Sequence, residues 1–460
     1  MPASKLAVVI LAAGKGTRMR SALPKVLHPL GGMPMIERVV RTAKALADTV
    51  IVVTAPGSED VRASLGELGV DFAIQRQQRG TGDALAAAVP HLPADCSRVL
   101  VLCGDVPLLT RATLDDLLAH TPTEGVGLVT AQFPDPSGLG RILRDVNGGV
   151  TAIVEERDAT AAERQITEIN AGIYLLPAVR LEEWLAALEA DNAQAEYYLT
   201  DVVRFAVAAE LPVNALLCVD RAEVSGVNDR LQLAELERVL QRRQAVALMR
   251  EGVSLLDPAR IDIRGELEAG RDCVIDVNCV FVGKVVLGRR VVIGAHCVIE
   301  DAEIDDDAVI APFTHISGAH VGAGARVGPF ARLREGTDLG EGTRVGNFVE
   351  TKKTRLGAGS KANHLAYLGD ATLGADCNVG AGTITCNYDG VDKHPTVLGN
   401  GVFVGSNSTL VAPLVLGEAA YVAAGSTITS DVPADALGVG RSRQRNIKSW
   451  MSPRKRGSKV

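Results

Sequence analysis

Aromatic residues are scarce in this chain: Phe, Tyr and Trp together make up 3% of its 460 residues. Proteins that bind single-stranded nucleic acid stack its bases on aromatic side chains, so this scarcity argues against that class. The net charge of −7 argues against a polyanionic partner as well. No apolar run reaches the roughly 18 residues that a membrane span requires. We therefore expect neither nucleic acid nor a membrane among the partners.

The eight cysteines lack the spacing of a zinc site, because the chain has no CxxC pair and no grouped His and Cys residues. Cys273, Cys279 and Cys297 lie multiples of six apart, which predicts one shared face of a repeat and reduced thiols rather than disulfides. The apolar run at residues 6–13 lacks the charge and the cleavage site of a signal peptide, so we predict a cytoplasmic protein. The basic stretch at residues 453–459 is interpreted as a solvated tail, with a binding element as the alternative.

An apolar residue recurs every six positions through much of the C-terminal half, as in Val321, Val327, Leu333, Leu339 and Val345. This period fits a solenoid in which each hexapeptide forms one side of a coil. Three hexapeptides close a coil of about 18 residues, and stacked coils bury a continuous core. The step shortens to five at two places, and the polar segment 385–395 interrupts it. That segment predicts a loop that leaves the coil.

The first half of the chain alternates short apolar runs with amphipathic stretches. We expect strands at residues 6–11, 50–54, 99–103, 127–130 and 215–219, and helices at residues 34–47, 83–89, 113–120 and 181–189. This alternation predicts a Rossmann-like α/β domain with a mostly parallel sheet.

A helix over residues 229–250, capped by Asn228 or Asp229 and followed by Gly252, marks the natural boundary. The predicted segments are an α/β domain at 1–228, a helical linker at 229–251 and a repeat domain at 252–460.

The first predicted strand runs into a turn with Gly14, Gly16 and Arg18, and Lys25 follows shortly after. The backbone N–H groups of such a turn can hold phosphate, although a plain tight turn has the same composition. Asp105 ends a buried strand, at the edge where open α/β sheets bind ligands. It could bind Mg²⁺ that bridges phosphates, or it could cap a loop.

The segments 11–19, 24–25 and 104–105 together resemble the nucleoside-diphosphate-sugar pyrophosphorylases. Gly140 and the segments 153–155, 168–172 and 224–228 narrow the resemblance to uridylyltransferases that use N-acetylglucosamine-1-phosphate. The resemblance implies nucleotide and sugar contacts from Leu11, Ala12, Ala13, Gly14, Arg18, Lys25, Gln75, Gly80, Thr81, Cys103, Gly104, Asp105, Gly140, Glu155, Asn170 and Asn228. It also implies Mg²⁺ at Asp105 and Asn228, although Asn228 could instead cap the boundary helix.

The implied reaction is attack of a sugar-phosphate oxygen on the α-phosphorus of UTP, with pyrophosphate as the leaving group. No general base is needed, because the attacking phosphate is already ionised at neutral pH. Mg²⁺, Lys25, Arg18 and the amides of the turn would offset the negative charge.

His364 stands among polar residues that gather around the slips and the interruption of the repeat. A lone histidine in a repeat is usually a packed or surface residue. Histidine titrates near neutral pH, however, which also suits it to deprotonate an attacking amine. Its polar neighbours in the pattern are Arg334, Lys352, Tyr367, Asn378, Asn387 and Tyr388.

The segments 347–353, 364–370 and 380–390 extend the resemblance to one family over residues 6–448. This family comprises the bifunctional N-acetylglucosamine-1-phosphate uridylyltransferases and glucosamine-1-phosphate N-acetyltransferases. The resemblance implies a C-terminal left-handed parallel β-helix of hexapeptide repeats that assembles homotrimers. It implies acetyl transfer from acetyl-CoA to glucosamine-1-phosphate, with His364 as the base. The implied substrate contacts are Arg334, Lys352, Tyr367 and Asn378, and those to acetyl-CoA are Ala381, Asn387, Tyr388, Ser406, Ala424 and Arg441.

Two other functions fit the same folds. A single-activity pyrophosphorylase could use its β-helix for assembly only, but this leaves His364 beside Tyr367 without a purpose. A regulatory protein without catalysis would be expected to have lost the glycine turn and Asp105, and both are present. Arg79 and Glu335 depart from the usual family pattern, and neither lies at a proposed catalytic position.

Overall fold

The computed structural model describes residues 5–450, so the predicted tail at residues 453–459 lies outside the described range. The chain forms two compact units, one up to Arg243 and the other from Gln244 on. Within the described range, none of the helices combines the length and the apolar character of a membrane span. The boundaries of a separate linker at residues 229–251 stay a prediction.

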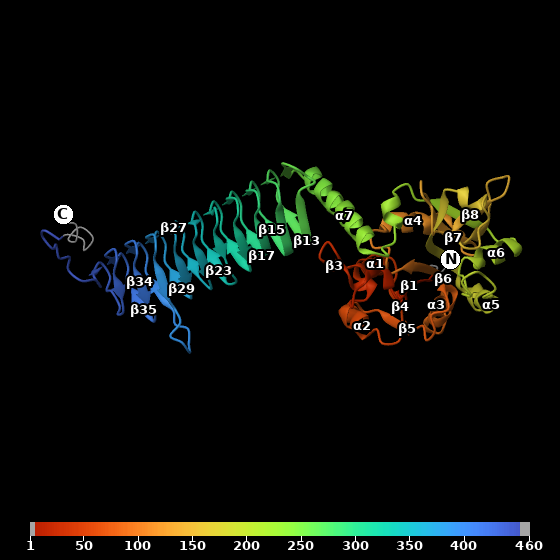
Figure 1. Cartoon of the computed structure of the whole chain (residues 1–460), viewed down its shortest axis with the longest axis horizontal. Coiled ribbons are helices and arrows are strands. Elements are labelled where there is room, and N and C mark those ends of the chain that lie inside the picture. Colours follow the sequence, from red (N-terminus) through yellow and green to blue (C-terminus); the bar gives the residue numbers. More distant parts are fainter. Residues whose placement is uncertain (1–4, 451–460) are drawn as a thin grey trace, which may run out of the picture. The chain divides into compact units, whose positions relative to one another are not determined.

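The first unit is built on a sheet with the strand order β11-β7-β10-β6-β1-β4-β5 (Figure 1). Neighbouring strands are parallel except where β10 pairs with β6 and β7. A hairpin of β8 and β9 joins the sheet through β10. The strands are β1 Lys5–Leu11, β4 Thr49–Thr54, β5 Asp71–Ile74, β6 Cys96–Cys103, β7 Val126–Gln132, β8 Arg141–Arg144, β9 Val150–Val154, β10 Glu168–Pro177 and β11 Val213–Leu217. The mostly parallel α/β domain is therefore confirmed.

Helices cover both faces of this sheet. The side chains of β1 point alternately to the two faces and therefore enter two separate cores. Val8 and Ile10 pack with α1 (Met35–Lys44), α2 (Glu59–Leu65) and α4 (Arg111–His120). Val9 points the other way and packs with α3 (Thr81–Ala88), α5 (Leu181–Ala186) and α6 (Asp201–Ala208). A strand buried on both faces explains the continuous apolar run at its centre.

The boundary helix is α7 (Arg230–Arg250), and Asp229 caps it. The carboxylate of Asp229 accepts hydrogen bonds from the backbone N–H groups of Leu231 at 3.0 Å and Gln232 at 2.9 Å. The sequence left open whether Asn228 or Asp229 caps α7, and these hydrogen bonds assign the cap to Asp229. Gly252 follows the helix at a φ of +100°, a conformation that glycine adopts without strain.

The second unit is a parallel β-helix (Figure 1), as the six-residue period predicted. An eleven-stranded sheet forms one side, and a sixteen-stranded sheet branches at β17 (Val298–Ile304) to form the other sides. The eleven strands are β12 Ser254–Leu255, β14 Val274–Ile275, β16 Val292–Ile293, β18 Val309–Ile310, β21 Arg326–Val327, β24 Arg344–Asn347, β27 Lys361–His364, β30 Asn378–Val379, β33 Phe403–Val404, β36 Tyr421–Val422 and β38 Leu437–Gly438.

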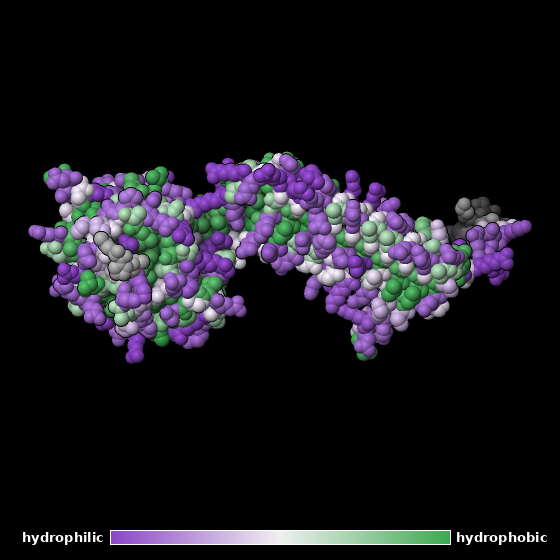
Figure 2. Space-filling view, turned by 180° about the vertical axis from the view of Figure 1, so that it is seen from behind, coloured by the Kyte–Doolittle hydropathy of each residue, from purple (hydrophilic) through white to green (hydrophobic). Residues whose placement is uncertain are grey.

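The predicted inward residues form the core of the coils. Val327 pairs with Val345 one coil later, and Val345 pairs with Ala362, so the coil shortens from 18 to 17 residues where the period slips. The polar segment 385–395 lengthens one coil, because Val379 pairs with Val404, 25 residues on. This segment leaves the solenoid as a loop, and Figure 2 shows it as a mostly hydrophilic projection.

The prediction of reduced cysteines fits the structure, but the prediction of one shared face is only half right. Cys279 and Cys297 lie at equivalent positions of neighbouring coils, whereas Cys273 precedes β14 on another side, because residues six apart lie on successive sides of a coil. All eight are free thiols, and Cys273, Cys279 and Cys297 are buried in the core of the β-helix. Burial raises the pKa of Cys279 to about 12 and that of Cys297 to about 11, so both stay protonated and unreactive at neutral pH.

Candidate active sites

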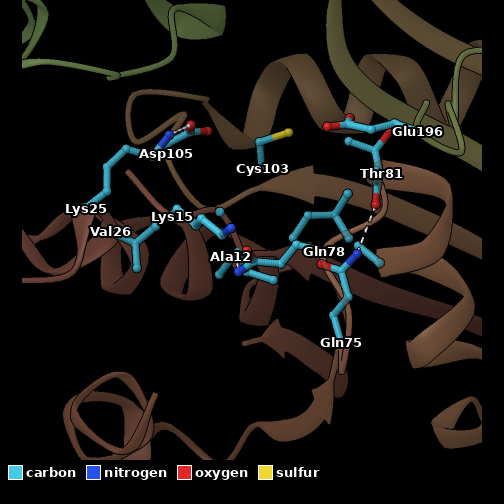
Figure 3. A pocket seen from close by; sticks show the side chains of 15 residues that line it. Ala12, Lys15, Lys25, Val26, Gln75, Gln78, Thr81, Cys103, Asp105 and Glu196 are labelled. Carbon is cyan, nitrogen blue, oxygen red and sulfur yellow. Dashed lines mark hydrogen bonds and ion pairs between the residues drawn. The ribbon is translucent and has the colours of Figure 1, made fainter. Parts of the chain in front are cut away.

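A cavity of about 410 Å³ lies where β1 ends and α3 begins (Figure 3). Ten of the residues predicted for the nucleotide line it: Leu11, Ala12, Ala13, Gly14, Lys25, Gln75, Gly80, Thr81, Cys103 and Asp105. Arg18 is exposed and is not among the lining residues, and Gly104 lies behind the wall, where a Cβ would meet that of Ala12 at 3.3 Å. We call this space the nucleotide cavity.

Gln75 has a fixed orientation at the base of the nucleotide cavity. Its amide nitrogen donates to the carbonyl oxygen of Gly80 at 3.0 Å and to the carboxylate of Asp83 at 2.9 Å. These two acceptors leave the amide oxygen of Gln75 to accept from a ligand. Gly80 has a φ of +112°, and a Cβ there would lie 2.5 Å from the carbonyl oxygen of Tyr197. Only glycine fits between the cavity and this neighbouring segment.

A second cavity of about 540 Å³ adjoins the first, and we call it the sugar cavity. Gly140, Glu155, Asn170 and Asn228 line it, as predicted for the sugar and metal positions. Cys103 and Asp105 line both cavities, so the two spaces meet at the C-terminal end of β6. A phosphate group on a ligand in either cavity can therefore reach Asp105.

Polar groups in the sugar cavity hold one another in place. The amide nitrogen of Asn170 donates to the hydroxyl of Tyr174 at 2.6 Å, while its amide oxygen accepts from the backbone N–H of Gly172 at 3.1 Å. Burial raises the pKa of Glu155, although a hydrogen bond with Thr200 opposes the shift. A desolvated carboxylate of this kind is typical of a site that binds polar hydroxyl groups.

Lys25 joins the two predicted metal ligands. Its ammonium contacts the carboxylate of Asp105, drawn as a dashed line in Figure 3, and lies 3.3 Å from the amide oxygen of Asn228. Two oxygens of hard, Mg²⁺-preferring type therefore converge on one cation. Among the described residues, no group of three or more His, Cys, Asp or Glu side chains is placed to hold a metal ion. Asp105 and Asn228 fit Mg²⁺ that takes its remaining ligands from phosphate and water.

Four residues predicted for acetyl transfer share one corner of the β-helix with Asn347, namely His364, Ala381, Ser406 and Ala424. Each of these five residues lies two positions after an inward residue of β24, β27, β30, β33 or β36. These inward residues pair in register from one coil to the next. The aligned corner residues are Asn347, His364, Ala381, Ser406 and Ala424. Backbone hydrogen bonds tie the successive corners together, for example from Gly425 to the carbonyl oxygen of Ser406 at 2.8 Å. We call this row the corner line. Arg441 lies just beyond its C-terminal end.

His364 is oriented by Asn347, its neighbour on the corner line. The Nδ1 atom of His364 lies 2.9 Å from the amide oxygen of Asn347, so in the neutral ring Nδ1 carries the proton and Nε2 is free to act as a base. The side chain of His364 is exposed. The role of His364 as a base stays a prediction.

Three cations, Arg334, Lys352 and Lys393, gather on another side of these coils. Arg334 and Lys352 directly follow Leu333 and Thr351, which pair between neighbouring coils of the sixteen-stranded sheet. The ammonium of Lys393 is the main cause that lowers the pKa of Lys352, and the guanidinium of Arg334 lowers it further. Arg334 itself donates to Glu350 at 2.8 Å. The crowding of like charges predicts an anion site that includes Lys393, a residue of the protruding loop.

Tyr367 and Asn387 lie beside this cation cluster. The hydroxyl of Tyr367 and the amide nitrogen of Asn387 would lie 2.5 Å and 2.8 Å from a Cβ on Gly369, and Gly369 pairs with Lys352 of the preceding coil. Asn387 also donates to the carboxylate of Asp370, and Tyr388 donates to the carbonyl oxygen of Gly390 at 2.6 Å. Asn378 begins β30, in register with Lys361 on β27. Within the described range, no hydrogen bond or ion pair links His364 to the cation cluster. The structure thus brings the predicted residues into two groups on the coil surface.

Sequence reasoning missed several residues that belong to these sites. Lys15, Gln78 and Glu196 line the nucleotide cavity, and Gln78 donates to the carbonyl oxygen of Ala13 at 2.5 Å. Lys15 could have been found from its place in the glycine-rich turn. Asn347 could have been found by counting 17 residues back from His364. Arg79 is exposed, stacks on Tyr197 at 5.2 Å and pairs with Asp83 at 2.8 Å, so it supports the cavity wall from outside.

The fold and the two cavities define a sugar-nucleotide transferase that carries a β-helix. Comparisons with known proteins agree. Residues 8–204 match the family described as the MobA-like NTP transferase domain. The bifunctional protein GlmU of Alkalilimnicola ehrlichii is 54% identical over 98% of this chain and 97% of its own length. Those of Marinobacter nauticus and Stutzerimonas stutzeri are 56% and 55% identical over 98% of this chain and 100% of their own lengths.

The chain therefore belongs to the family of the bifunctional GlmU proteins. This membership confirms the family resemblance and the expectation of a bifunctional transferase with uridylyl and acetyl transfer activities.

Proposed function

We propose that uridylyl transfer takes place where the nucleotide cavity meets the sugar cavity. UTP lies in the first and N-acetylglucosamine-1-phosphate in the second. An ionised oxygen of the sugar phosphate attacks the α-phosphorus of UTP, and the bond to the β-phosphate oxygen breaks, which releases pyrophosphate and forms UDP-N-acetylglucosamine. The observation that carries this proposal is the position of Asp105, which lines both cavities.

Asp105 and Asn228 would hold Mg²⁺ in this reaction. When bound, the ion neutralises phosphate charge and stabilises the charge that develops on the leaving pyrophosphate. The protein adds the ammonium groups of Lys15 and Lys25, which also line the nucleotide cavity. Because no proton must be removed, positioning and electrostatics account for the catalysis.

The fixed amide of Gln75 supports the choice of uracil. Its free oxygen would accept a hydrogen bond from N3–H of uracil. Cytosine presents an acceptor at the same ring position, so its lone pair would face the oxygen of Gln75. We therefore propose that the enzyme selects UTP over CTP by this contact, since a site built for one hydrogen-bonding pattern rejects ligands that leave its buried groups unpaired.

Acetyl transfer is proposed to take place along the corner line. The amino nitrogen of glucosamine-1-phosphate attacks the thioester carbonyl of acetyl-CoA, Nε2 of His364 takes the proton of the amine, and coenzyme A leaves as the thiol or thiolate. Arg334, Lys352 and Lys393 would bind the sugar phosphate, with Tyr367, Asn378 and Asn387 around the sugar. Ala381, Ser406 and Ala424, with Tyr388 and Arg441, would contact acetyl-CoA. The alignment of His364 with three of these positions supports this assignment.

A homotrimer built through the β-helix is part of the same proposal. His296, Phe313, Phe330 and Phe348 stack in a row with ring centroids 4.9, 5.0 and 5.5 Å apart, and Phe348 directly follows Asn347 of the corner line. The Phe348 side chain is 57% exposed and that of Leu365, next to His364, is 60% exposed. A second subunit that covers this aromatic row would also enclose His364, which a cyclic assembly allows. A cytoplasmic location, predicted from the sequence, is in keeping with the eight free thiols.

Two assays test these assignments. Pyrophosphate release is measured with UTP, Mg²⁺ and N-acetylglucosamine-1-phosphate, and CTP serves as the comparison nucleotide. Thiol release is measured with acetyl-CoA and glucosamine-1-phosphate, after subtraction of a blank without acceptor because the protein's own thiols react. We expect both activities and a preference for UTP. Equal use of CTP would refute the role of Gln75, and the absence of thiol release above the blank would refute the role of the corner line.

A further inference from the structure

The proposed metal site contains a cation that belongs to the protein itself. The ammonium of Lys25 contacts Asp105 and lies 3.3 Å from Asn228, and the side chains of Lys25 and Asp105 are only 12% and 23% exposed. These are the two side-chain oxygens that would bind Mg²⁺. An ammonium and a magnesium ion cannot occupy this position together, because their charges repel at such a distance in a partly buried site.

The Cβ end of the Lys25 side chain is fixed by packing, while its ammonium can reach a second position in the nucleotide cavity. Lys25 begins the short helix η2 (Lys25–Leu27), and a Cβ on Gly16 would lie 2.5 Å from the Cβ of Lys25. The glycine-rich turn therefore packs directly against the stem of this side chain. Lys25 also lines the nucleotide cavity, so rotation of its flexible four-carbon stem can carry the ammonium toward a bound triphosphate.

Backbone hydrogen bonds hold the segment of Asn228 next to Asp105. The backbone N–H of Val227 donates to the carbonyl oxygen of Asp105 at 2.9 Å, and the backbone N–H of Asn228 donates to Gln232 at 2.8 Å. The backbone segments that carry Asp105 and Asn228 are thus tied together, whichever cation lies between their side chains.

We propose that Lys25 occupies the metal position of the free enzyme and leaves it when UTP binds. Its ammonium moves from Asp105 to the phosphates, and the vacated oxygens then take Mg²⁺. The binding of nucleotide and metal is thereby linked, and the linkage acts equally in both directions. The free enzyme would bind Mg²⁺ weakly and would acquire the ion together with its substrate. This inference rests on the proposed role of Asp105 and Asn228 as metal ligands.

The test measures metal binding to the free protein without any substrate. Mn²⁺ serves as the probe, and its bound fraction is measured by electron paramagnetic resonance. Removing the competing ammonium in Lys25→Gln should tighten Mn²⁺ binding roughly tenfold, within the usual range of coupling between sites. Lys25→Arg keeps the charge and should resemble the wild type. Lys15→Gln removes an equal charge from the same cavity without vacating Asp105, so its affinity should change less than about twofold.

The variants separately test the role of Lys25 and the proposed metal site at Asp105 and Asn228. If Asp105→Asn, alone or combined with Lys25→Gln, binds Mn²⁺ as well as its parent, the metal site itself is wrongly placed. If Asp105→Asn abolishes binding but Lys25→Gln binds no more tightly than wild type, the site stands and the role of Lys25 is refuted. An equal gain in Mn²⁺ affinity in Lys15→Gln would also refute the role of Lys25, because the loss of any positive charge from the cavity would then explain the effect. Should Lys25→Gln unfold, Lys25→Met keeps the aliphatic stem and undergoes the same test.

Discussion

Replacing Asn347 should slow acetyl transfer although Asn347 has no proposed contact with either substrate. Its amide oxygen, 2.9 Å from Nδ1 of His364, fixes both the orientation and the tautomer of the proposed base. In Asn347→Ala this hydrogen bond is lost, and such a bond stabilises by about 1 kcal/mol. The exposed ring also regains rotamer freedom, and ordering it again costs about 1 kcal/mol. Since about 1.4 kcal/mol corresponds to a tenfold change in rate, the expected loss in kcat is about 30-fold.

The assay is acceptor-dependent thiol release, with pyrophosphate formation measured on the same preparation. Asn347→Asp keeps an acceptor oxygen and should retain most of the activity. Asn278→Ala is the matched control, because Asn278 and His296 form another pair between asparagine and histidine of the same β-helix, at 3.4 Å. It should leave acetyl transfer unchanged. If Asn347→Ala stays within twofold of wild type, or loses uridylyl transfer as well, the reasoning about tautomer and orientation is refuted.

Three further predictions concern the nucleotide cavity, the packing of the coils and the dependence of stability on pH. Gln75→Leu should lower kcat/KM for UTP at least about tenfold, because it removes the proposed contact to the base and takes one of the hydrogen-bond donors from the carbonyl of Gly80 and from the carboxylate of Asp83; unchanged kinetics with UTP would contradict this. Gly346→Ala should destabilise the β-helix by about 3 kcal/mol or more in denaturant unfolding, since its Cβ would lie 1.9 Å from the carbonyl oxygen of Asn363. Gly324→Ala, which meets open space at a φ of +64°, should cost only about 1 kcal/mol, and equal losses in the two variants would count against the packing argument. Burial alone would lower the pKa of His320, but its hydrogen bonds to Asp338 and Asp305 outweigh this and raise it above 6.5. The stabilisation from its charge is therefore full below pH 6.5 and lost as pH rises through the raised value, so the stability deficit of His320→Gln should be larger at pH 6 than at pH 9, by no more than about 1 kcal/mol in view of solvent screening. Equal deficits at the two pH values would contradict it.

The sequence predicted the elements whose patterns are local. The apolar runs located β1, β4, β6, β7 and β11 to within a few residues, and the six-residue period identified the inward positions of the coils. It did not predict β10, whose antiparallel entry between β6 and β7 depends on pairing with strands far away in the chain. The helix expected at residues 181–189 ends at Ala186, because propensity does not fix where a short surface helix stops.

The site residues likewise divide into those that the sequence predicted and those that depend on the folded structure. Glycines and charged residues at strand ends, such as Gly14 and Asp105, were predicted because their chemistry is unusual for their position. Asn347 and Gln78 look like ordinary polar residues, and only the alignment of coils or the closure of a cavity gives them a role. Whether Asn228 or Asp229 caps α7 could not be decided from residue type, since both suit the position, and the hydrogen bonds of Asp229 decide it.

The central claim is that one chain carries two separate chemistries, which a single reaction mixture can test. Glucosamine-1-phosphate, acetyl-CoA, UTP and Mg²⁺ are incubated together, and UDP-N-acetylglucosamine and its intermediate are quantified by mass spectrometry. We expect the wild type to complete both steps, His364→Ala to form no intermediate, and Asp105→Asn to accumulate N-acetylglucosamine-1-phosphate. A mixture of the two variants should restore the final product. Loss of both steps in either variant, or acetyl transfer that persists in His364→Ala, would contradict the account.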